Sequence, residues 1–300
     1  MSMDKISFFD QIERNKRNSW ILIFSVFLFI VFFAWVIAQV YDPGFTFIFL
    51  VFGIIFSLIY TVGTYRYSDT IALKSVNAYE AVGDRFSHLR NQVEGLALGS
   101  GLPTPRVYVM PSADINAFAS GRDPKHSVVC VTEGALNKLS DRELEAVLAH
   151  EMTHIRNYDI RFVTLVAVMV GIVSIVSEIF LRSMWFGGGG RDRGRGNALF
   201  LVFGIILAIL APIIVRLVQL SISRKREYMA DAGSVQLTRT TSGMISALKK
   251  IKADYGGGAK TKVNAAVAPM FLADPVGERF VNLFKTHPPI DDRIKTLKMM

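Results

Sequence analysis

Two long apolar runs limit what this chain of 300 residues can fold into. Residues 20–40 and residues 44–65 contain no charged side chain. As a helix, each run is long enough to cross a hydrocarbon layer of about 30 Å. The alternative is a pair of buried core helices in a large globular domain. The length of the runs and their lack of charged residues favour two membrane helices.

Two further apolar runs follow later in the chain. Residues 162–181 contain one charge, Glu178, and residues 198–215 contain Pro212. A membrane helix tolerates proline when its neighbours satisfy the freed carbonyl group. Buried core helices stay open as the alternative for this pair. We therefore expect about four transmembrane helices, with the depth of the second pair undecided.

The basic residues indicate how the chain is oriented in a bilayer. Four of them precede the first run, which places residues 1–19 in the cytoplasm by the positive-inside rule: Lys5, Arg14, Lys16 and Arg17. Arg182, Arg191, Arg193 and Arg195 lie between the later runs, where the rule disfavours them if both runs cross. The basic residues behind the net charge of +9 are distributed over segments that flank the apolar runs. They do not form a patch in which basic and aromatic residues alternate. We therefore expect a lipid bilayer as partner, and no nucleic acid.

The polar stretch of residues 66–160 mixes helix and strand patterns. We expect a helix over residues 76–98 and strands over residues 106–110, 115–120 and 127–132, the last two forming a hairpin. Ser140 and Glu143 have capping-box spacing, which begins a helix. Residues 223–248 read as one or two further helices, and a short helix closes the chain. Cys130, the single cysteine, lies in an apolar run and is expected to be a buried thiol.

The helix that begins after Ser140 carries the sequence His150-Glu151-Met152-Thr153-His154. Histidines four residues apart lie on one face of a helix, so both rings can reach a single metal ion. Glu151 is placed to act as a general base on water that the metal activates. Two histidines brought together by chance are the alternative. The spacing favours one catalytic zinc ion per chain, although another metal in the cell stays open.

A catalytic zinc site normally uses three protein ligands. Two crossings after His154 would return the chain to the same side of the membrane near residue 223. Glu227 and Asp231 are four apart there, so Glu227 could bind the metal and Asp231 could hold a histidine ring. The alternative is a pair of solvated carboxylates beside Arg224, Lys225 and Arg226.

Three segments together resemble a known family. Residues 150–159, residues 227–231 and His287-Pro288-Pro289 with Arg293 look like the HtpX-type integral-membrane zinc metalloproteases, which are related to the CAAX prenyl endopeptidases. The likeness covers nearly the whole chain, including the order of its apolar segments. It implies that Glu227 is the third zinc ligand. It also implies an α-helical membrane protein with an α+β, zincin-like (gluzincin) catalytic domain and a small β-hairpin or sheet beside the active-site helix.

The resemblance assigns several further roles. Asn116, Ala117, Phe118 and Ala119 match the edge strand that would pair with an extended substrate, although the Phe118 ring could equally be a core aromatic. His287 would stabilise the oxyanion and Arg293 would support the cleft. Asp159 also matches the motif, with an ion pair to a nearby arginine as the alternative.

These observations lead to one functional hypothesis. We expect a multi-pass zinc endopeptidase of a bacterial or archaeal plasma membrane, with its active site facing the cytoplasm and Glu151 acting as base and then acid. Its substrates would be polypeptides, and the resemblance implies that they are misfolded membrane proteins in quality control. A processing protease for specific or lipidated peptides, or a noncatalytic zinc-binding scaffold, are the alternatives. The expected segments are residues 1–19 (cytoplasmic), 20–65 (helical pair), 66–160 (first catalytic part), 161–222 (second hydrophobic hairpin) and 223–300 (second catalytic part).

Overall fold

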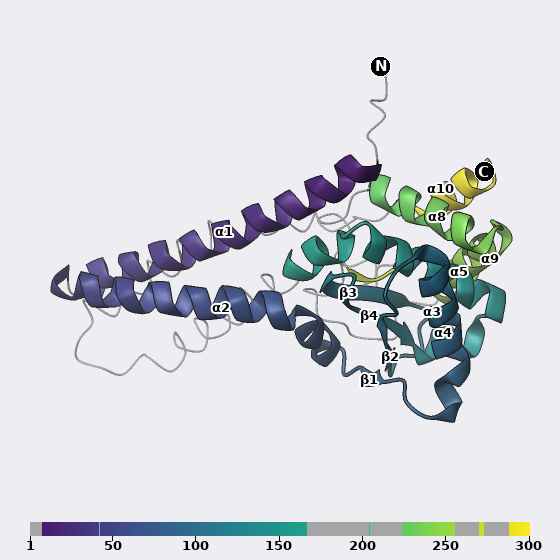
Figure 1. Cartoon of the computed structure of the whole chain (residues 1–300), viewed down its shortest axis with the longest axis horizontal. Coiled ribbons are helices and arrows are strands. Elements are labelled where there is room, and N and C mark those ends of the chain that lie inside the picture. Colours follow the sequence, from purple (N-terminus) through teal and green to yellow (C-terminus); the bar gives the residue numbers. More distant parts are fainter. Residues whose placement is uncertain (1–7, 42, 167–203, 205–223, 256–269, 273–287) are drawn as a thin grey trace, which may run out of the picture.

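The computed structural model describes residues 8–41, 43–166, 204, 224–255, 270–272 and 288–300. This part of the chain forms a long two-helix arm and a body of helices around a small sheet (Figure 1). Nearly all of the second apolar pair, and His287, lie outside the described residues. The crossing predicted for residues 162–215 therefore stays a prediction.

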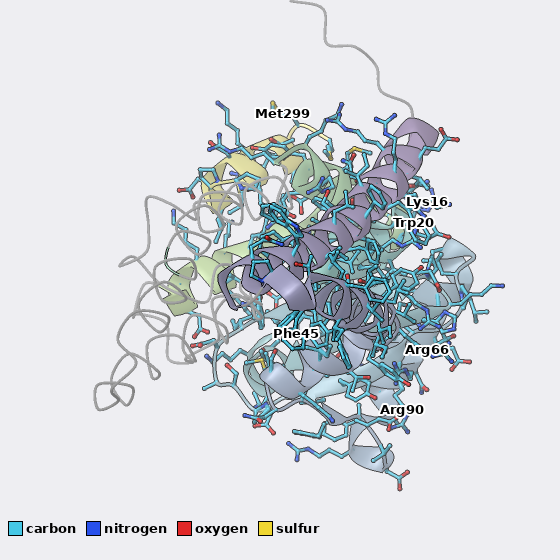
Figure 2. All side chains as sticks on the ribbon, turned by 90° about the vertical axis from the view of Figure 1, so that its left-hand side faces the viewer. Lys16, Trp20, Phe45, Arg66, Arg90 and Met299 are labelled. Carbon is cyan, nitrogen blue, oxygen red and sulfur yellow. The ribbon has the colours of Figure 1, made fainter. Side chains whose placement is uncertain are left out.

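The arm consists of α1 (Phe8–Tyr41) and α2 (Thr46–Ser75), joined by the short helix η1 (Pro43–Phe45). The helices approach closely at Gly53, where a Cβ atom would lie 2.4 Å from the Cβ of Ala34. Both are long and apolar enough to cross a membrane. Large apolar side chains, Phe47 and Phe52 among them, are exposed along the arm. Figure 2 looks along this arm from its tip near Phe45. An apolar surface of this kind suits acyl chains better than water.

The sheet has four strands in the order β1-β2-β4-β3. They are β1 (Tyr79–Glu80), β2 (Arg106–Met110), β3 (Ala117–Asp123) and β4 (His126–Thr132). β2 and β4 are parallel, whereas β3 and β4 form the predicted antiparallel hairpin. Gly121 has φ +140° in this hairpin, and a Cβ there would lie 2.2 Å from the carbonyl oxygen of His126. The hairpin leaves β3 at one edge of the sheet.

The helix predicted over residues 76–98 is wrong in its first half. This segment contains β1 and the 3₁₀ turn η2 (Asp84–Phe86), and α3 spans only Ser87–Ser100. Gly83 has φ +84°, a value that ends any helical path. The N–H of Ala81 donates to the carbonyl of Val107, so strand pairing takes the place of helical hydrogen bonds.

The central helix of the body is α5 (Asp141–Arg156), which begins with the predicted capping box. The N–H of Ser140 donates to Glu143 Oε2 over 2.7 Å. Val147, Leu148 and Met152 are buried in the main core. The sheet edge β3 and the helices α3, α8 and α9 pack around α5. The remaining helices are α4 (Glu133–Lys138), α8 (Arg224–Thr238), α9 (Ser242–Tyr255) and α10 (Ile290–Leu297).

Cys130 lies on β4 in a second apolar cluster that contains Phe118 and Phe271. Burial raises the pKa of its thiol, which keeps the sulfur protonated and unreactive. The prediction of a buried thiol is confirmed.

The helices α5 and α8 approach each other closely at Gly233. A Cβ at this position would lie 2.3 Å from Thr153 Oγ1 and 2.5 Å from its Cγ2. We predict that Gly233→Ala lowers the free energy of unfolding by about 1–3 kcal/mol, because the two helices must separate. Gly95→Ala is the matched control, since no atom lies within 4 Å of its added Cβ in α3. Thermal unfolding in detergent would measure both. Equal stability of the two variants would contradict this packing.

Candidate metal centre

His150 and His154 lie one turn apart on α5 and direct their rings to the same point. Their Nε2 atoms are 3.2 Å apart, and their ring planes are nearly perpendicular. His150 is fully buried, and the side chain of His154 is 15% exposed. The helix therefore brings together, at the edge of the core, two nitrogens that could bind one metal ion.

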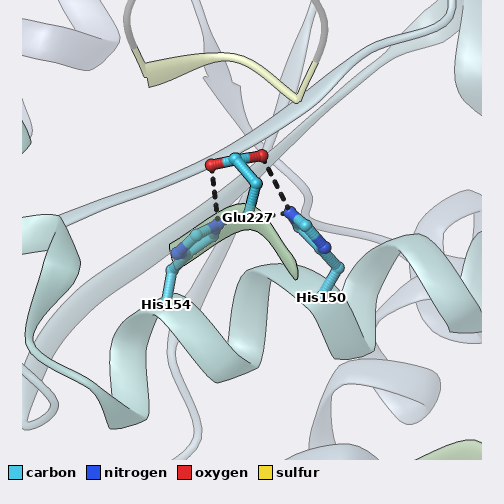
Figure 3. Close-up of side chains that lie close together, drawn as sticks. All are labelled: His150, His154 and Glu227. Carbon is cyan, nitrogen blue, oxygen red and sulfur yellow. Dashed lines mark hydrogen bonds and ion pairs between the residues drawn. The ribbon is translucent and has the colours of Figure 1, made fainter. Parts of the chain in front are cut away.

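Glu227, near the beginning of α8, supplies the third group (Figure 3). Its Oε2 lies 3.7 Å from His150 Nε2, and its Oε1 lies 3.7 Å from His154 Nε2. Two atoms bound tetrahedrally to one zinc ion are roughly 3.4 Å apart, given zinc distances near 2.1 Å. The three side chains offer one ligand atom each, all within 4.8 Å of one another. Their spacing fits a single metal ion.

A carboxylate holds the outer nitrogen of each histidine. Asp231 Oδ1 lies 3.0 Å from His150 Nδ1, and Asp159 Oδ2 lies 3.0 Å from His154 Nδ1. When the Nδ1–H group donates a hydrogen bond to a carboxylate, Nε2 of the neutral ring carries no proton. Its lone pair then points away from that carboxylate. Both rings are thus oriented with Nε2 facing Glu227.

Arg293 joins α10 to this arrangement. It is 1% exposed and donates from Nε and Nη2 to the two oxygens of Asp231, over 2.9 Å and 2.6 Å. Its Nη1 lies 3.7 Å from Glu227 Oε2 and donates to the carbonyl of Leu272. Burial alone would raise the pKa of Asp231, but the charge of Arg293 and the hydrogen bond from His150 lower it. The side chain of Arg293 therefore fixes the acid that holds His150.

Glu151 lies between the histidines in sequence and is 2% exposed. Burial raises its pKa to about 7, against the weaker lowering effects of His154 and of the hydrogen bond from the N–H of Ala119. A carboxyl group with a pKa near neutrality can accept and return a proton at physiological pH. The position and pKa of Glu151 suit general acid-base chemistry.

The two histidines differ in their electrostatic surroundings. Burial lowers the pKa of His150 to about 4. Burial alone would also lower the pKa of His154, but the hydrogen bond to Asp159 and the charge of Glu227 raise it to about 9. Positive charge is thus favoured between His154, Glu227 and Asp159, where a bound cation would also be stabilised.

The sheet edge predicted for substrate lies beside this cluster. The Phe118 ring is buried against Phe271, with ring centroids 5.0 Å apart, so its side chain belongs to the core. The carbonyl of Ala117 accepts a hydrogen bond from the N–H of Leu272, over 3.0 Å. The N–H of Ala119 donates to Glu151. Part of the outer edge of β3 is therefore bonded within the chain itself.

The structure brings together the residues predicted from α5, α8 and α10, and adds one that sequence reasoning missed. Asn15 Nδ2, on α1, donates to Asp159 Oδ1 over 2.6 Å. Its position before an apolar run carries no recognisable signal. Arg226 Nε also lies 3.5 Å from Asp159 Oδ1, so the arginine contact considered as an alternative exists beside the bond to His154.

Comparison with known proteins agrees with this geometry. Residues 84–300 match peptidase family M48. Proteins named Protease HtpX homolog are 42% identical in Dictyoglomus thermophilum and 43% in Caldanaerobacter subterraneus, over 304 and 306 residues. The alignments cover 99% of this chain in both cases, and 96% and 99% of those relatives.

The fold is also similar to the crystal structure of S. mikatae Ste24p, with a TM-score of 0.50 and 18% identity. This likeness covers 95% of the chain and 66% of Ste24p. It concerns the fold alone, whereas the HtpX relatives match in sequence over nearly the whole length. The chain therefore belongs to peptidase family M48, as a metalloprotease of the HtpX type.

Proposed function

We propose that the protein is a membrane zinc endopeptidase in which His150, His154 and Glu227 hold one zinc ion. The observation that carries the proposal is the convergence of three donor atoms within 4.8 Å of one another, from two helices that are distant in sequence. Two histidine Nε2 atoms and one carboxylate form a ligand set found in catalytic zinc sites, where the fourth coordination position is left for water. The buried Glu151 beside them supplies the base that such a site needs.

The residues around the metal divide the chemistry between them. When bound, zinc polarises the scissile carbonyl and lowers the pKa of water. Glu151 takes the proton of the attacking water and returns it to the leaving amine. Asp231 and Asp159 accept hydrogen bonds from the Nδ1–H groups of the two imidazoles, which directs Nε2 toward the metal position, and Arg293 holds Asp231 in place. His287, which lies outside the described residues, remains our proposed stabiliser of the oxyanion.

We further propose that an extended substrate pairs with the outer edge of β3. This edge borders Glu151 through the N–H of Ala119. Leu272 already occupies the carbonyl of Ala117 and Glu151 the N–H of Ala119, so the substrate would displace these contacts or pair with the edge beyond them. Backbone pairing would make cleavage depend on an unfolded, extended segment more than on particular side chains. Such selectivity suits quality control of misfolded membrane proteins.

Two features of the arm support our proposal for the side of the membrane that the active site faces. The N-terminal end of α1 lies against the body, beside α8 (Figure 1). Exposed Arg14 and Arg17 occur on this end and favour the cytoplasm. The metal centre lies on the same side as these residues, since Asn15 contacts Asp159. We propose a multi-pass plasma-membrane protein with a cytoplasmic active site.

A processing protease for specific or lipidated peptides would use the same machinery, and a profile of cleaved substrates would separate it from a quality-control protease. A noncatalytic scaffold is disfavoured, because a structural zinc site needs neither a buried base nor an open coordination position.

Replacing the base tests the mechanism. We predict that Glu151→Gln keeps one zinc per chain but cleaves an unfolded protein at least about 100-fold more slowly, since general acid-base catalysis contributes that much or more. Zinc content and peptide release would be measured on the same purified sample. Glu145→Gln, a carboxylate on the same helix, should behave as the wild type. Undiminished cleavage by Glu151→Gln would refute the assigned role.

The second apolar pair can be tested by thiol labelling. Because Cys130 is buried, a cysteine introduced by Gly188→Cys would be the accessible thiol. If residues 162–215 cross twice, a membrane-impermeant reagent should label it in intact cells but should not label Ser2→Cys. Labelling of Gly188→Cys only after the membrane is opened would contradict four crossings.

A further inference from the structure

Asn15 is a buried polar residue in the part of α1 that precedes the apolar run. It is 4% exposed. Its Nδ2 donates to the backbone carbonyl of Asn157 over 3.0 Å and to Asp159 Oδ1 over 2.6 Å. The carbonyl and the carboxylate can only accept hydrogen bonds, so the side-chain nitrogen of Asn15 must be the donor to both. One side chain thus joins the N-terminal helix to the residues that follow α5.

Asp159 carries this contact to the metal centre. Its Oδ2 lies 3.0 Å from His154 Nδ1, and the side chain is 3% exposed. Arg226, from α8, approaches Oδ1 at 3.5 Å. Because Oδ1 accepts a hydrogen bond from Asn15 while Oδ2 contacts the His154 ring, both oxygens of the carboxylate are held in place. The orientation of the His154 ring therefore depends, through Asp159, on Asn15 and Arg226.

The backbone between these residues is strained. Tyr158 has φ +58°, a left-handed value that is unfavourable for a residue with a large side chain. Lys16 Nζ lies 4.3 Å from the centre of the Tyr158 ring. In Figure 2, Lys16 and Trp20 lie close together on α1. Contacts from α1 therefore support the turn that presents Asp159.

We propose that Asn15 is a positioning residue for the metal ligand His154 and acts through the carboxylate of Asp159. This inference rests on the proposed function, since it assumes that His154 binds zinc. Without the amide donor, a buried carboxylate oxygen loses a hydrogen bond and the carboxylate no longer has one fixed orientation. The amino-terminal helix thereby becomes one of the elements that determine metal affinity.

A purely anchoring role for Asn15 would have different consequences. The arm has a separate attachment to the body, where Trp20 and Tyr65 stack with ring centroids 6.0 Å apart and Arg161 lies over both rings. Loss of an anchor would change stability or the docking of α1. Loss of a positioning contact would change zinc affinity and the ligand field at the metal while the chain stays folded.

The test uses the full-length protein in detergent, with Zn²⁺ and Co²⁺ as probes. Asn15→Leu replaces the amide by an apolar group of similar size. Asn18→Leu makes the same change on α1 and is the matched control. We expect Asn15→Leu to bind zinc about 10-fold more weakly in chelator competition, as is typical when support of a ligand is lost. Its Co²⁺ absorption should shift, whereas Asn18→Leu should match the wild type.

A double-mutant cycle tests whether Asn15 acts on His154 through Asp159. In an Asp159→Ala background, Asn15→Leu should cause no further loss of zinc affinity, because its partner is gone. The same loss in both backgrounds, or none in the wild type, would overturn the proposal. If Asn15→Leu does not fold, Asn15→Ala removes the donor without adding bulk or a second carboxylate beside Asp159 and should give a comparable weakening. A wild-type protein without zinc at His154 would instead refute the proposed function.

Discussion

The packing of α5 against α8 is the contact on which the candidate metal centre depends. Glu227 is far from His150 and His154 in sequence, and only this packing brings its carboxylate to them. Gly233 permits the close approach by facing Thr153 without a side chain. Ser234 Oγ strengthens it by donating to the carbonyl of Ala146 over 2.6 Å. The spacing of the three side chains is thus set by two ordinary features of helix packing, a missing Cβ and a buried hydroxyl.

Buried charge is the second constraint. Four carboxylates, those of Glu151, Asp159, Glu227 and Asp231, lie within or beside the cluster and are almost inaccessible to water. Arg293 neutralises one of them directly, and Arg226 and Asn15 support another. Unpaired charge is costly in such surroundings. A divalent cation between the two histidines and Glu227 would offset this excess of acid and leave Glu151 free to exchange protons.

Sequence reasoning succeeded where local chemistry decides the structure. The capping box at Ser140, the hairpin of β3 and β4 and the four-residue spacing of the histidines each act within a few residues. It failed over residues 76–86, because strand pairing with β2 outweighs the helical pattern there. Asn15 could not be predicted, since its role arises from a contact 144 residues away. Glu227 was proposed from chain order and resemblance, and its distance to the histidines required the fold.

The most direct test of the central claim is anomalous X-ray scattering at the zinc edge from crystals of the purified protein. The account predicts one peak per chain, about 2.0–2.2 Å from His150 Nε2, His154 Nε2 and a carboxylate oxygen of Glu227. A protein that cleaves polypeptides with its metal bound elsewhere, or with Glu227 turned away from the metal, would contradict it.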